Sequence, residues 1–464
     1  MTTFILNHEK ISTDLPSGSL LLDFIRYSKS LKGTKIGCRE GDCGACSVLV
    51  GKLTSNGMKY EQVTSCLTPL GNIANNHVVT IEGLNMDNLS PVQEHMINES
   101  GTQCGFCTVG FVVSLTSFCM ANQNATYEQA IASIDGNICR CTGYKSIERA
   151  AKKITTDLSN KNTDDTINWL IENQYIPAYF NGIPNQIKDL ELGHTKQIGQ
   201  IVGGGTDLYV QKHGELIDKQ LVHINKSEEL KFIKVENDHL HIGGGTTVTE
   251  FAESSEIKNI FPNLDAHIKL VSSSLIRNIS TFAGNFVNAS PIGDFTIFFI
   301  ALNASITIEN DTSKREILLK DLYKGYKDLA MEKDELISAL SFPIPSPNTR
   351  FNLEKVSKRT HLDIASVNSA LSISSSGNNI ESISVSCGGV GPTPMMLEKT
   401  SAFLTGKVLS AANLKLANET LQEEINPISD VRGSEKYKRL LLRQLFYAHF
   451  LKLFPTVIKL EDLT

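Results

Sequence analysis

The first 85 residues alternate between short apolar runs and polar turns, a pattern typical of β-structure. Two of these runs flank Asn7-His8-Glu9 as the arms of a predicted hairpin. Residues 20–27 instead carry apolar side chains at helical spacing, which predicts an amphipathic helix capped by Ser17 or Ser19. Strands are predicted at residues 2–6, 10–13, 47–52, 60–63 and 77–81. This region therefore predicts a small sheet domain with one helix.

The apolar spacing becomes helical between Pro91 and about Leu158. Helices are predicted at residues 92–97, 109–120, 127–133 and 144–154. The polar stretch that follows, Ser159 to Thr166, has no apolar period and predicts an exposed linker. The pattern therefore predicts a separate helical module before the linker.

A third region begins near Ile187 and contains two glycine runs. Gly203 to Gly205 directly follows a predicted strand, and Gly243 to Gly245 echoes it. Backbone amides approach a pyrophosphate in such runs, but a tight turn between strands produces the same pattern. The first run does not match the dinucleotide fingerprint G-x-G-x-x-G, because its last position falls on Leu208. Residues alone leave the phosphate loop and the simple turn open for both runs.

Two further patterns divide the second half of the chain. Phe295 to Ile308 is the longest apolar run, too short to span a bilayer, and predicts a core helix running into a strand. Pro343 to Pro347 breaks the pattern and predicts a subdomain boundary. The tail from Ser429 to Arg439 leads into a last predicted amphipathic helix.

Composition narrows the class of protein. A chain of 464 residues with 41% hydrophobic and 20% charged residues predicts a globular protein of several domains. The net charge of −6 argues against a nucleic-acid partner. The N-terminus lacks the pattern of a signal peptide, so we expect a cytoplasmic protein with no membrane contact.

Ten cysteines in such a chain favour metal binding or catalysis over disulfides. Cys38, Cys43, Cys46 and the distant Cys66 have the C-x4-C-x2-C spacing of plant-type 2Fe–2S ferredoxins. Gly37, Gly41 and Gly44 lie among the first three, where backbone amides must face an anionic cluster. Structural zinc is the alternative, although zinc sites usually have paired C-x2-4-C knuckles.

A second set of four consists of Cys104, Cys107, Cys139 and Cys141. Cys107 and Cys141 are each predicted to open a helix, whose free N–H groups favour an anionic ligand. One C-x2-C pair alone would also suit a redox dithiol, but the combination with C-x-C after a ferredoxin-type set favours a second cluster. The remaining Cys119 and Cys387 are interpreted as buried, inert thiols.

The two cysteine sets resemble the iron–sulfur module of the molybdenum hydroxylases, the family of xanthine dehydrogenase and aldehyde oxidase. The resemblance extends to Gln103-Cys104-Gly105-Phe106-Cys107-Thr108 and to the stretch from Gly136 to Tyr144. It implies a β-grasp 2Fe–2S domain followed by a four-helix 2Fe–2S domain. It also implies a partner chain that carries molybdopterin.

The first glycine run and the stretch from Thr281 to Asp294 resemble the flavoprotein domain of the same family, which binds FAD in a fold that is not of the Rossmann type. Lys355 lies in a loop that resembles the one beside the flavin ring. Asn288 and Asp294 could otherwise cap a tight Ser-Pro turn. The resemblance implies an FAD site formed by Ile201, Val202, Gly203, Gly204, Gly205, Thr206, Asp207, Leu208, Ser280, Thr281, Gly284, Asn285, Asn288, Asp294 and Lys355.

The expected fold class is α+β with several domains, including a two-part FAD-binding domain of the PCMH type and a C-terminal α/β subdomain. The expected boundaries are 1–85 for the ferredoxin-type domain, 86–158 for the helical domain, 159–168 for the linker, 169–345 for the FAD-binding domain and 346–464 for the C-terminal subdomain.

The resemblance implies an electron-transfer subunit of a xanthine dehydrogenase-type oxidoreductase. Electrons would pass from the molybdenum subunit through the two clusters to FAD and on to NAD, in an assembly with two copies of each chain. No catalytic acid, base or nucleophile is required in this chain. The alternatives are the same module in an aldehyde, nicotinate or aromatic acyl-CoA enzyme, a free-standing NADH:acceptor reductase, and a zinc-stabilised interaction protein.

Overall fold

The computed structural model describes residues 1–190 and 199–463. The chain divides into two compact units. The first unit contains residues 1–223 and Ser273–Ser280, and the second contains residues 224–272 and those from Thr281 onward. The predicted FAD-binding domain, 169–345, contributes to both units, and its residues 191–198 lie outside the described part of the chain.

The first unit begins with a five-stranded sheet of order β2-β1-β5-β3-β4. Its strands are β1 (Thr2–Leu6), β2 (Glu9–Thr13), β3 (Ser47–Thr54), β4 (Gly57–Thr64) and β5 (His77–Val79). Strands β1 and β5 are parallel, and the two hairpins are antiparallel. The predicted hairpin around Asn7 is confirmed, and the sheet has the expected β-grasp order.

The helix that covers one face of this sheet begins as α1 (Leu21–Asp23) and continues as a π-helix, Phe24–Ser28. The predicted serine cap is wrong, because Leu20 precedes the helix without a side-chain cap. The Ser19 hydroxyl instead donates to the carbonyl of Ile217, 2.9 Å away. Phe24 and Ile25 of the π-helix enter the buried core of the sheet.

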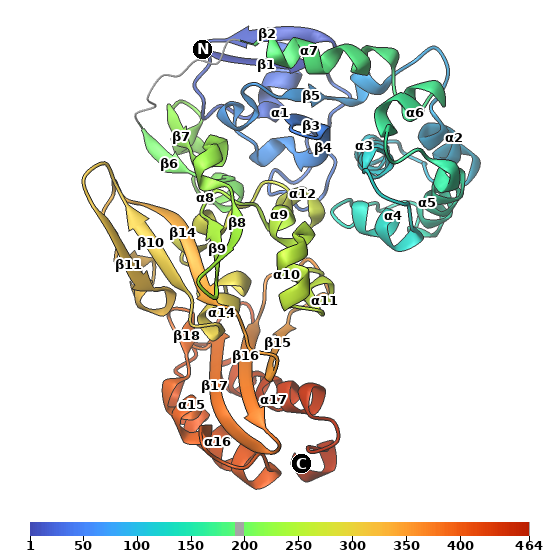
Figure 1. Cartoon of the computed structure of the whole chain (residues 1–464). Helices are drawn as coiled ribbons and strands as arrows, with labels where there is room; N and C mark the ends of the chain where they lie inside the picture. The colour runs from blue at the N-terminus through green and yellow to red at the C-terminus, as the bar shows by residue number, and fades with distance from the viewer. Residues whose placement is uncertain (191–198, 464) are drawn as a thin grey trace. The chain divides into compact units, whose positions relative to one another are not determined.

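The helical module contains α2 (Pro91–Asn98), α3 (Thr108–Met120), α4 (Tyr127–Ser133) and α5 (Lys145–Asp157). Ser90 and Thr126 form capping boxes that satisfy the free N–H groups at the starts of α2 and α4. Helix α3 packs against the sheet, and residues of β3, β4 and β5 share one apolar core with the helices. The two modules are therefore not separately packed: Figure 1 shows α3 between the sheet and the other helices.

The rest of the first unit contains α6 (Thr166–Glu172), α7 (Ile183–Lys188), β6 (Gln200–Val202), α8 (Thr206–Leu216), β7 (Leu221–His223) and α12 (Ser274–Arg277). The segment predicted as a linker is mostly exposed. Lys161 is an exception, because its buried side chain donates to the carbonyls of Cys119 and Ala121 at the end of α3.

The second unit contains an antiparallel sheet of order β11-β10-β14-β9-β8. Its strands are β8 (Ile233–Glu236), β9 (His239–Gly243), β10 (Ser305–Glu309), β11 (Lys314–Leu318) and β14 (Leu336–Pro343). A two-stranded ribbon, β12 (Tyr323–Gly325) with β13 (Asp328–Leu329), lies in the chain between β11 and β14. The accompanying helices are α9 (Val248–Glu253), α10 (Ser255–Ile260), α11 (Leu264–Ile268), α13 (Phe282–Val287) and α14 (Asp294–Ala301).

The apolar run predicted as a core helix and strand is confirmed as α14 and β10. Nearly every residue of α14 is buried, and its phenylalanines pack in edge-to-face contacts with Phe251 and Phe282. Helix α14 also packs on β16 and β17, so it connects the two sheets of this unit.

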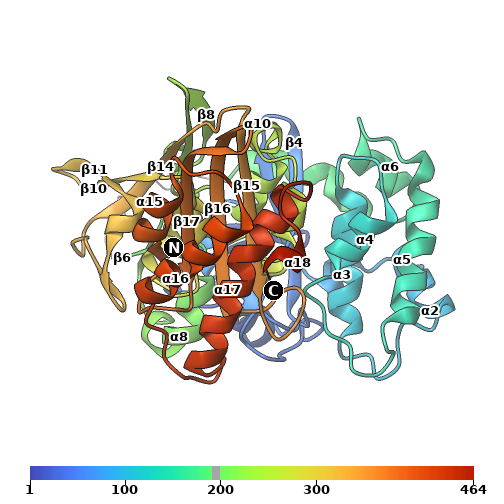
Figure 2. The same ribbon diagram turned by 90° about the horizontal axis from the view of Figure 1, so that it is seen from below.

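The second sheet of this unit has the order β15-β16-β17-β18. Its strands are β15 (Thr349–Val356), β16 (Val367–Ser376), β17 (Asn379–Gly388) and β18 (Met395–Met396). Four helices follow: α15 (Glu398–Leu404), α16 (Ala411–Glu424), α17 (Glu435–Leu453) and α18 (Leu460–Leu463). Helix α17 covers β15 and β16, as Figure 2 shows, and confirms the predicted last amphipathic helix.

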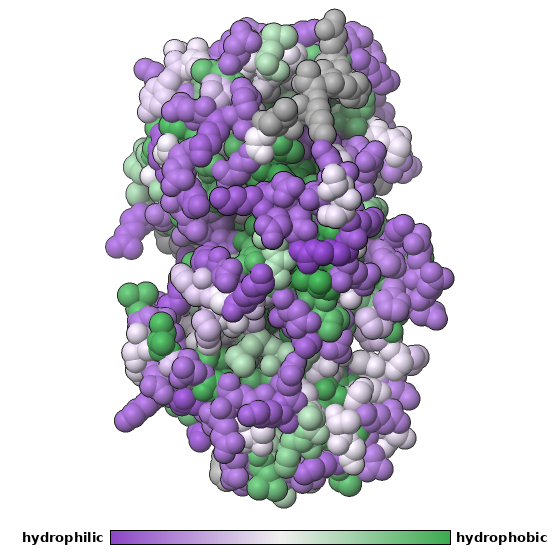
Figure 3. All heavy atoms as spheres, turned by 90° about the vertical axis from the view of Figure 1, so that its left-hand side faces the viewer, coloured by the Kyte–Doolittle hydropathy of each residue, from purple (hydrophilic) through white to green (hydrophobic). Residues whose placement is uncertain are grey.

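The surface agrees with the ordinary charge content of the chain. On the face drawn in Figure 3, hydrophilic residues surround smaller apolar groups. Among the described residues, the helices are all too short or too polar to cross a bilayer.

Candidate functional site

The first cysteine set lies in the loop between the π-helix and β3, with Cys66 in the short 3₁₀ helix Ser65–Leu67. Its thiols meet in two pairs, Cys38 with Cys43 and Cys46 with Cys66. Cys46 and Cys66 are buried, whereas the other pair is half-buried. The N–H of Glu40 donates to Cys38 Sγ over 3.3 Å, as expected of a loop whose amides face sulfur.

The second cysteine set is also arranged in two pairs. The Sγ atoms of Cys104 and Cys141 lie 3.6 Å apart, and Cys107 contacts Cys139. Cys104 and Cys141 are exposed, while Cys139 is buried. In each predicted set the structure therefore brings the four cysteines together, although those of the second set come from segments about thirty residues apart in the sequence.

One prediction about the second set is wrong. Cys107 does precede α3 directly, but Cys141 does not open a helix, because α5 begins only at Lys145. Gly143 and Tyr144 between them have φ of +66° and +68°, so the chain turns before the helix starts. The sulfur of Cys139 is stabilised by Thr142 instead of by a helix N-terminus. Thr142 donates to Cys139 Sγ from its hydroxyl, at 3.2 Å, and from its backbone N–H.

The surroundings favour thiolate at one member of each of the four pairs; at Cys104 the hydrogen bond from the backbone N–H of Phe106 is the main cause that lowers the pKa. The hydrogen bond from the Cys43 thiol lowers the pKa of Cys38, and the one from Cys66 lowers the pKa of Cys46. Burial alone would raise the pKa of Cys139, but the hydrogen bonds from Thr142 outweigh it and lower that pKa. Thiolate is the form that binds metal, so these contacts suit ligands.

Paired thiols fit a cluster with two irons. Two thiolates held tetrahedrally at about 2.3 Å from one metal lie about 3.8 Å apart, close to the spacing of Cys104 and Cys141. Within residues 1–190 and 199–463, no three His, Cys, Asp or Glu side chains converge on a single metal-ion position. Each set thus contains the two pairs of thiols that a 2Fe–2S cluster requires.

The two sets are in direct contact through the backbone. The N–H of Ile138, next to Cys139, donates to the carbonyl of Cys43 over 3.0 Å. The side chain of Asn137 donates to the neighbouring carbonyl of Gly44 over 3.2 Å, and Ser114 of α3 fixes that side chain. The loops of the two candidate clusters are therefore held in a fixed register.

The two glycine runs differ in what their amides do. In the second run, Gly243, Gly244 and Gly245 all donate to carbonyls, those of Phe232, Ser338 and Leu230. In the first run, the amides of Gly204 and Gly205 donate to no acceptor in the described part of the chain. The second run is therefore a structural turn, and only the first has amides for a phosphate.

The first run joins β6 to α8. Gly205 has φ of +83°, which only glycine adopts readily, and it ends the loop where α8 begins. A Cβ at Gly204 would lie 1.9 Å from the carbonyl oxygen of Ile279. Glycine is thus required at position 204 because the backbone of the segment ending at Ser280 lies too close for a side chain. The glycine pattern had suggested a different reason, that a side chain there would fill the phosphate position.

Apart from Ser280, which lies in the first unit, the other predicted FAD residues belong to the second unit, and several already have partners there. The hydroxyl of Thr281 caps α13 by accepting from the N–H of Gly284, at 3.2 Å. Asn285 accepts from Thr296, and Asn288 accepts from Lys327 through its backbone carbonyl and side chain. These side chains are thus held in place before any ligand binds.

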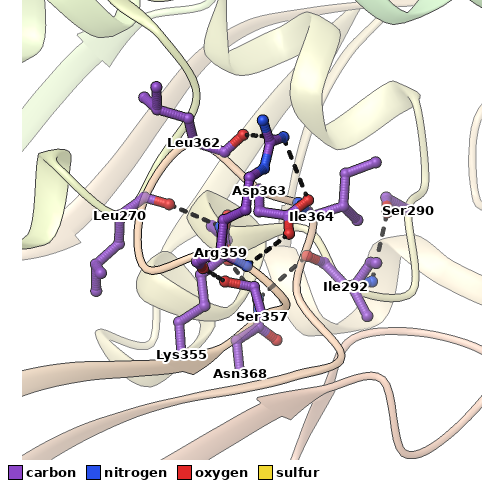
Figure 4. A network of polar contacts seen from close by, with 11 residues as sticks. Leu270, Ser290, Ile292, Lys355, Ser357, Arg359, Leu362, Asp363, Ile364 and Asn368 are labelled. Atoms are coloured by element: carbon purple, nitrogen blue, oxygen red, sulfur yellow. Dashed lines mark hydrogen bonds and ion pairs between the residues drawn. The ribbon is translucent and has the colours of Figure 1, made fainter. Parts of the chain in front are cut away.

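Asp294 and Lys355, predicted separately, form a buried ion pair with 2.7 Å between Oδ2 and Nζ. Lys355 also donates to the carbonyl of Leu270 (Figure 4). Asp294 Oδ1 accepts from Asn368 at 2.6 Å. Sequence reasoning missed Asn368. Its only signal was a polar residue inside the apolar start of β16.

Figure 4 also shows the loop from Ser357 to Ile364 beside this network. The N–H of Arg359 donates to the carboxylate of Asp363, which links the two ends of the loop.

The two cysteines outside the sets agree with their interpretation as buried, inert thiols. Cys119 and Cys387 are fully buried, and burial raises the pKa of both thiols, that of Cys119 to about 12.

Four family models match consecutive parts of the chain. They are the 2Fe–2S iron–sulfur cluster binding domain over residues 4–71, the [2Fe–2S] binding domain over 80–152, the FAD binding domain in molybdopterin dehydrogenase over 183–345, and the CO dehydrogenase flavoprotein C-terminal domain over 354–453.

Relatives and solved structures agree with these models. The chain is 27% identical to xanthine dehydrogenase of Emericella nidulans over 96% of its length, and 24% identical to xanthine dehydrogenase/oxidase of Rattus norvegicus over 97%. It covers only 38% of each of these relatives. A chain of carbon monoxide dehydrogenase from Hydrogenophaga pseudoflava has a similar fold, with a TM-score of 0.51 and 24% identity over 53% of this chain and 86% of that one.

Two iron–sulfur domains followed by a FAD-binding domain define an iron–sulfur flavoprotein. The order and identity of the four models go further: the chain belongs to the molybdenum hydroxylase family, whose members named above are oxidoreductases.

Proposed function

We propose that this chain is the electron-transfer part of a xanthine dehydrogenase-type molybdenum hydroxylase. The observation that supports this most is the arrangement of eight thiols as two sets of two pairs. In the proposal, one cluster is held by Cys38, Cys43, Cys46 and Cys66, and the other by Cys104, Cys107, Cys139 and Cys141. The five-part domain division expected from the sequence belongs to the same proposal.

When bound, the clusters supply one-electron transfer and FAD converts two such electrons into a hydride for NAD. The chain's own residues hold and tune these groups. The N–H of Glu40 and both donors of Thr142 stabilise negative charge on Cys38 and Cys139. The hydrogen bond from Ile138 to Cys43 keeps the two ligand loops adjacent.

FAD is proposed to bind along Ile201–Leu208, with its pyrophosphate at the amides of Gly204 and Gly205. Ser280, Thr281, Gly284, Asn285, Asn288, Asp294 and Lys355 complete the proposed set of contact residues. The unengaged amides of the first glycine run support this assignment over the second run. The pair Lys355–Asp294 would present a fixed, hydrogen-bonded group rather than a mobile charge.

A molybdopterin-binding chain is the proposed partner, in an assembly with two copies of each chain. The surface around the second cysteine set supports docking there. Phe106, Ile138 and Tyr144 are 40–46% exposed beside the exposed Cys104 and Cys141. Exposed aromatic and aliphatic side chains of this kind are typical of an interface core.

Cofactor content tests the proposal. The purified chain is expected to contain four iron, four acid-labile sulfide and one non-covalent FAD, since eight thiols in four pairs ligate two clusters. Metal analysis, sulfide assay and the visible spectrum measure this. A colourless protein with bound zinc would overturn the proposal in favour of a zinc-stabilised interaction protein.

A further inference from the structure

An asparagine of the ferredoxin-type module holds the first glycine loop. Asn72 lies in the 3₁₀ helix Leu70–Ile73, six residues after Cys66. Its Nδ2 donates to the carbonyl of Gly204 over 3.1 Å. The carbonyl of Gly204 can only accept a hydrogen bond, so the Asn72 side-chain amide must face it with Nδ2. Oδ1 of Asn72 therefore faces His223, and it accepts from Nδ1 of that ring, 2.6 Å away.

This contact is built into the core rather than formed on the surface. Asn72 is 6% exposed and His223 5%. His223 ends β7 and is the register partner of Val202, the last residue of β6 before the glycines. A Cβ at Gly71 would lie 2.0 Å from the His223 ring, so the chain keeps glycine where the ring approaches.

The held carbonyl determines where the next amide points. In a planar trans peptide, the C=O of one residue and the N–H of the next point in opposite directions. Because the carbonyl of Gly204 points to Asn72, the N–H of Gly205 points away from the ferredoxin-type module. That N–H is one of the two amides with no acceptor in the described residues.

We infer that Asn72, a residue of the iron–sulfur module, is a positioning residue for the pyrophosphate of FAD. The inference depends on the proposed FAD site, and it adds a determinant of flavin affinity outside the predicted FAD-binding domain. Without the Nδ2 donor, the Gly204–Gly205 peptide loses the contact that fixes its orientation. His223 supports Asn72 from the strand that pairs with β6.

The test replaces Asn72 by Asp, which keeps size and Oδ1 but removes the donor. In the full chain with both clusters loaded, the Kd for FAD is expected to rise about tenfold, the effect of one lost hydrogen bond at a ligand-binding peptide. The Kd for ADP, which has the pyrophosphate, should rise by the same factor. The Kd for riboflavin, which has no phosphate, should not change.

Asn7→Asp is the matched control. Asn7 is 7% exposed, belongs to the same sheet module and donates through Nδ2 to the hydroxyl of Thr80, far from the glycine loop in the sequence. It should leave all three Kd values at those of the wild type. Asn72→Ser, which is too short to reach Gly204, provides a second variant if Asn72→Asp does not fold.

The outcomes separate the inference from the proposed function. A wild-type chain that binds neither FAD nor ADP would overturn the FAD site itself. A wild type that binds FAD, with Asn72 variants of equal affinity, would overturn only the role of Asn72. Equal losses for riboflavin and ADP would also overturn it, because general damage to the fold would then explain the effect.

Discussion

Individual residues determine how the two cysteine sets are arranged as candidate ligands. The spacing of Cys38, Cys43 and Cys46 could be read from the sequence because those ligands lie within one short loop. The pairing of Cys104 with Cys141, and the thiolate-stabilising role of Thr142, could not, because both depend on how distant loops meet. Local spacing therefore predicts the candidate ligands, and the structure shows how their thiols pair.

Replacing Cys43 by Ser tests the independence of the two sets. Because each set has its own four thiols, we expect one of two EPR signals to disappear and the other to remain. Cys387→Ser is the control, since that thiol is buried far from both sets in the sequence and should leave both signals. Loss of both signals from folded Cys43→Ser protein would contradict two separate sites.

A buried histidine gives the second unit a predictable response to acid. Burial lowers the pKa of His449 to about 3, and within the described part of the chain its ring forms hydrogen bonds with Asn352 and Ser369. Between pH 6.5 and the folded pKa, the unfolded chain is protonated and the folded chain is not. The free energy of unfolding should therefore fall by up to about 1.4 kcal/mol for each unit of decreasing pH in that window.

His449→Gln should reduce this slope, because glutamine does not titrate. The measurement is urea unfolding of the full chain, followed by circular dichroism at several pH values from 7 to 5. His8→Gln, at an exposed position in the other unit, should leave the slope unchanged. Equal slopes for wild type and His449→Gln would show that this histidine is not the group responsible.

At the level of elements, the sequence predicted local structure well and side-chain networks poorly. The hairpins, the helices of the second module and the α14–β10 run follow from apolar periodicity, which short segments express by themselves. The start of α5 was predicted to within one residue, but Cys141 does not open this helix, because two consecutive residues with positive φ separate them. The network of Lys355, Asp294 and Asn368 joins β15, α14 and β16, and no local pattern encodes such a contact.

That network should contribute to stability. In Lys355→Met, the Asp294 carboxylate remains mostly buried without its cation, which should lower the free energy of unfolding by about 3 kcal/mol. Urea unfolding of the flavin-free chain measures the change. Lys320→Met is the control, because the pair Lys320–Glu398 is exposed and should cost less than about 1 kcal/mol. Equal effects of the two substitutions would contradict a special role for the buried pair.

For the whole molecule, the sequence predicted the fold class, and the comparisons with known proteins agree with it. The division into two units could not be predicted, because it depends on contacts such as those of Asp135 with Ser274 and Arg277. These residues lie about 140 positions apart in the sequence. Apolar periodicity describes residues a few positions apart, so it cannot predict which distant segments make contact.

The whole chain provides a test of the proposed division of labour. The purified chain alone should oxidise NADH with an artificial dye, because the proposed flavin and cluster sites lie within it. It should not convert xanthine to urate, since none of its four matched domains is a molybdopterin-binding one. Urate formed by the single chain, free of any partner, would contradict the proposal.

The way in which the chain divides into two units limits how it can be cut. The backbone passes from one unit to the other three times, at residues 223–224, 272–273 and 280–281. A single break at the first crossing would leave Ser273–Ser280 attached to the wrong fragment, and with them Asn278, whose side chain donates to Gln62 in β4. No single protease cut, and no gene divided at one position, can therefore yield the two units as independent pieces.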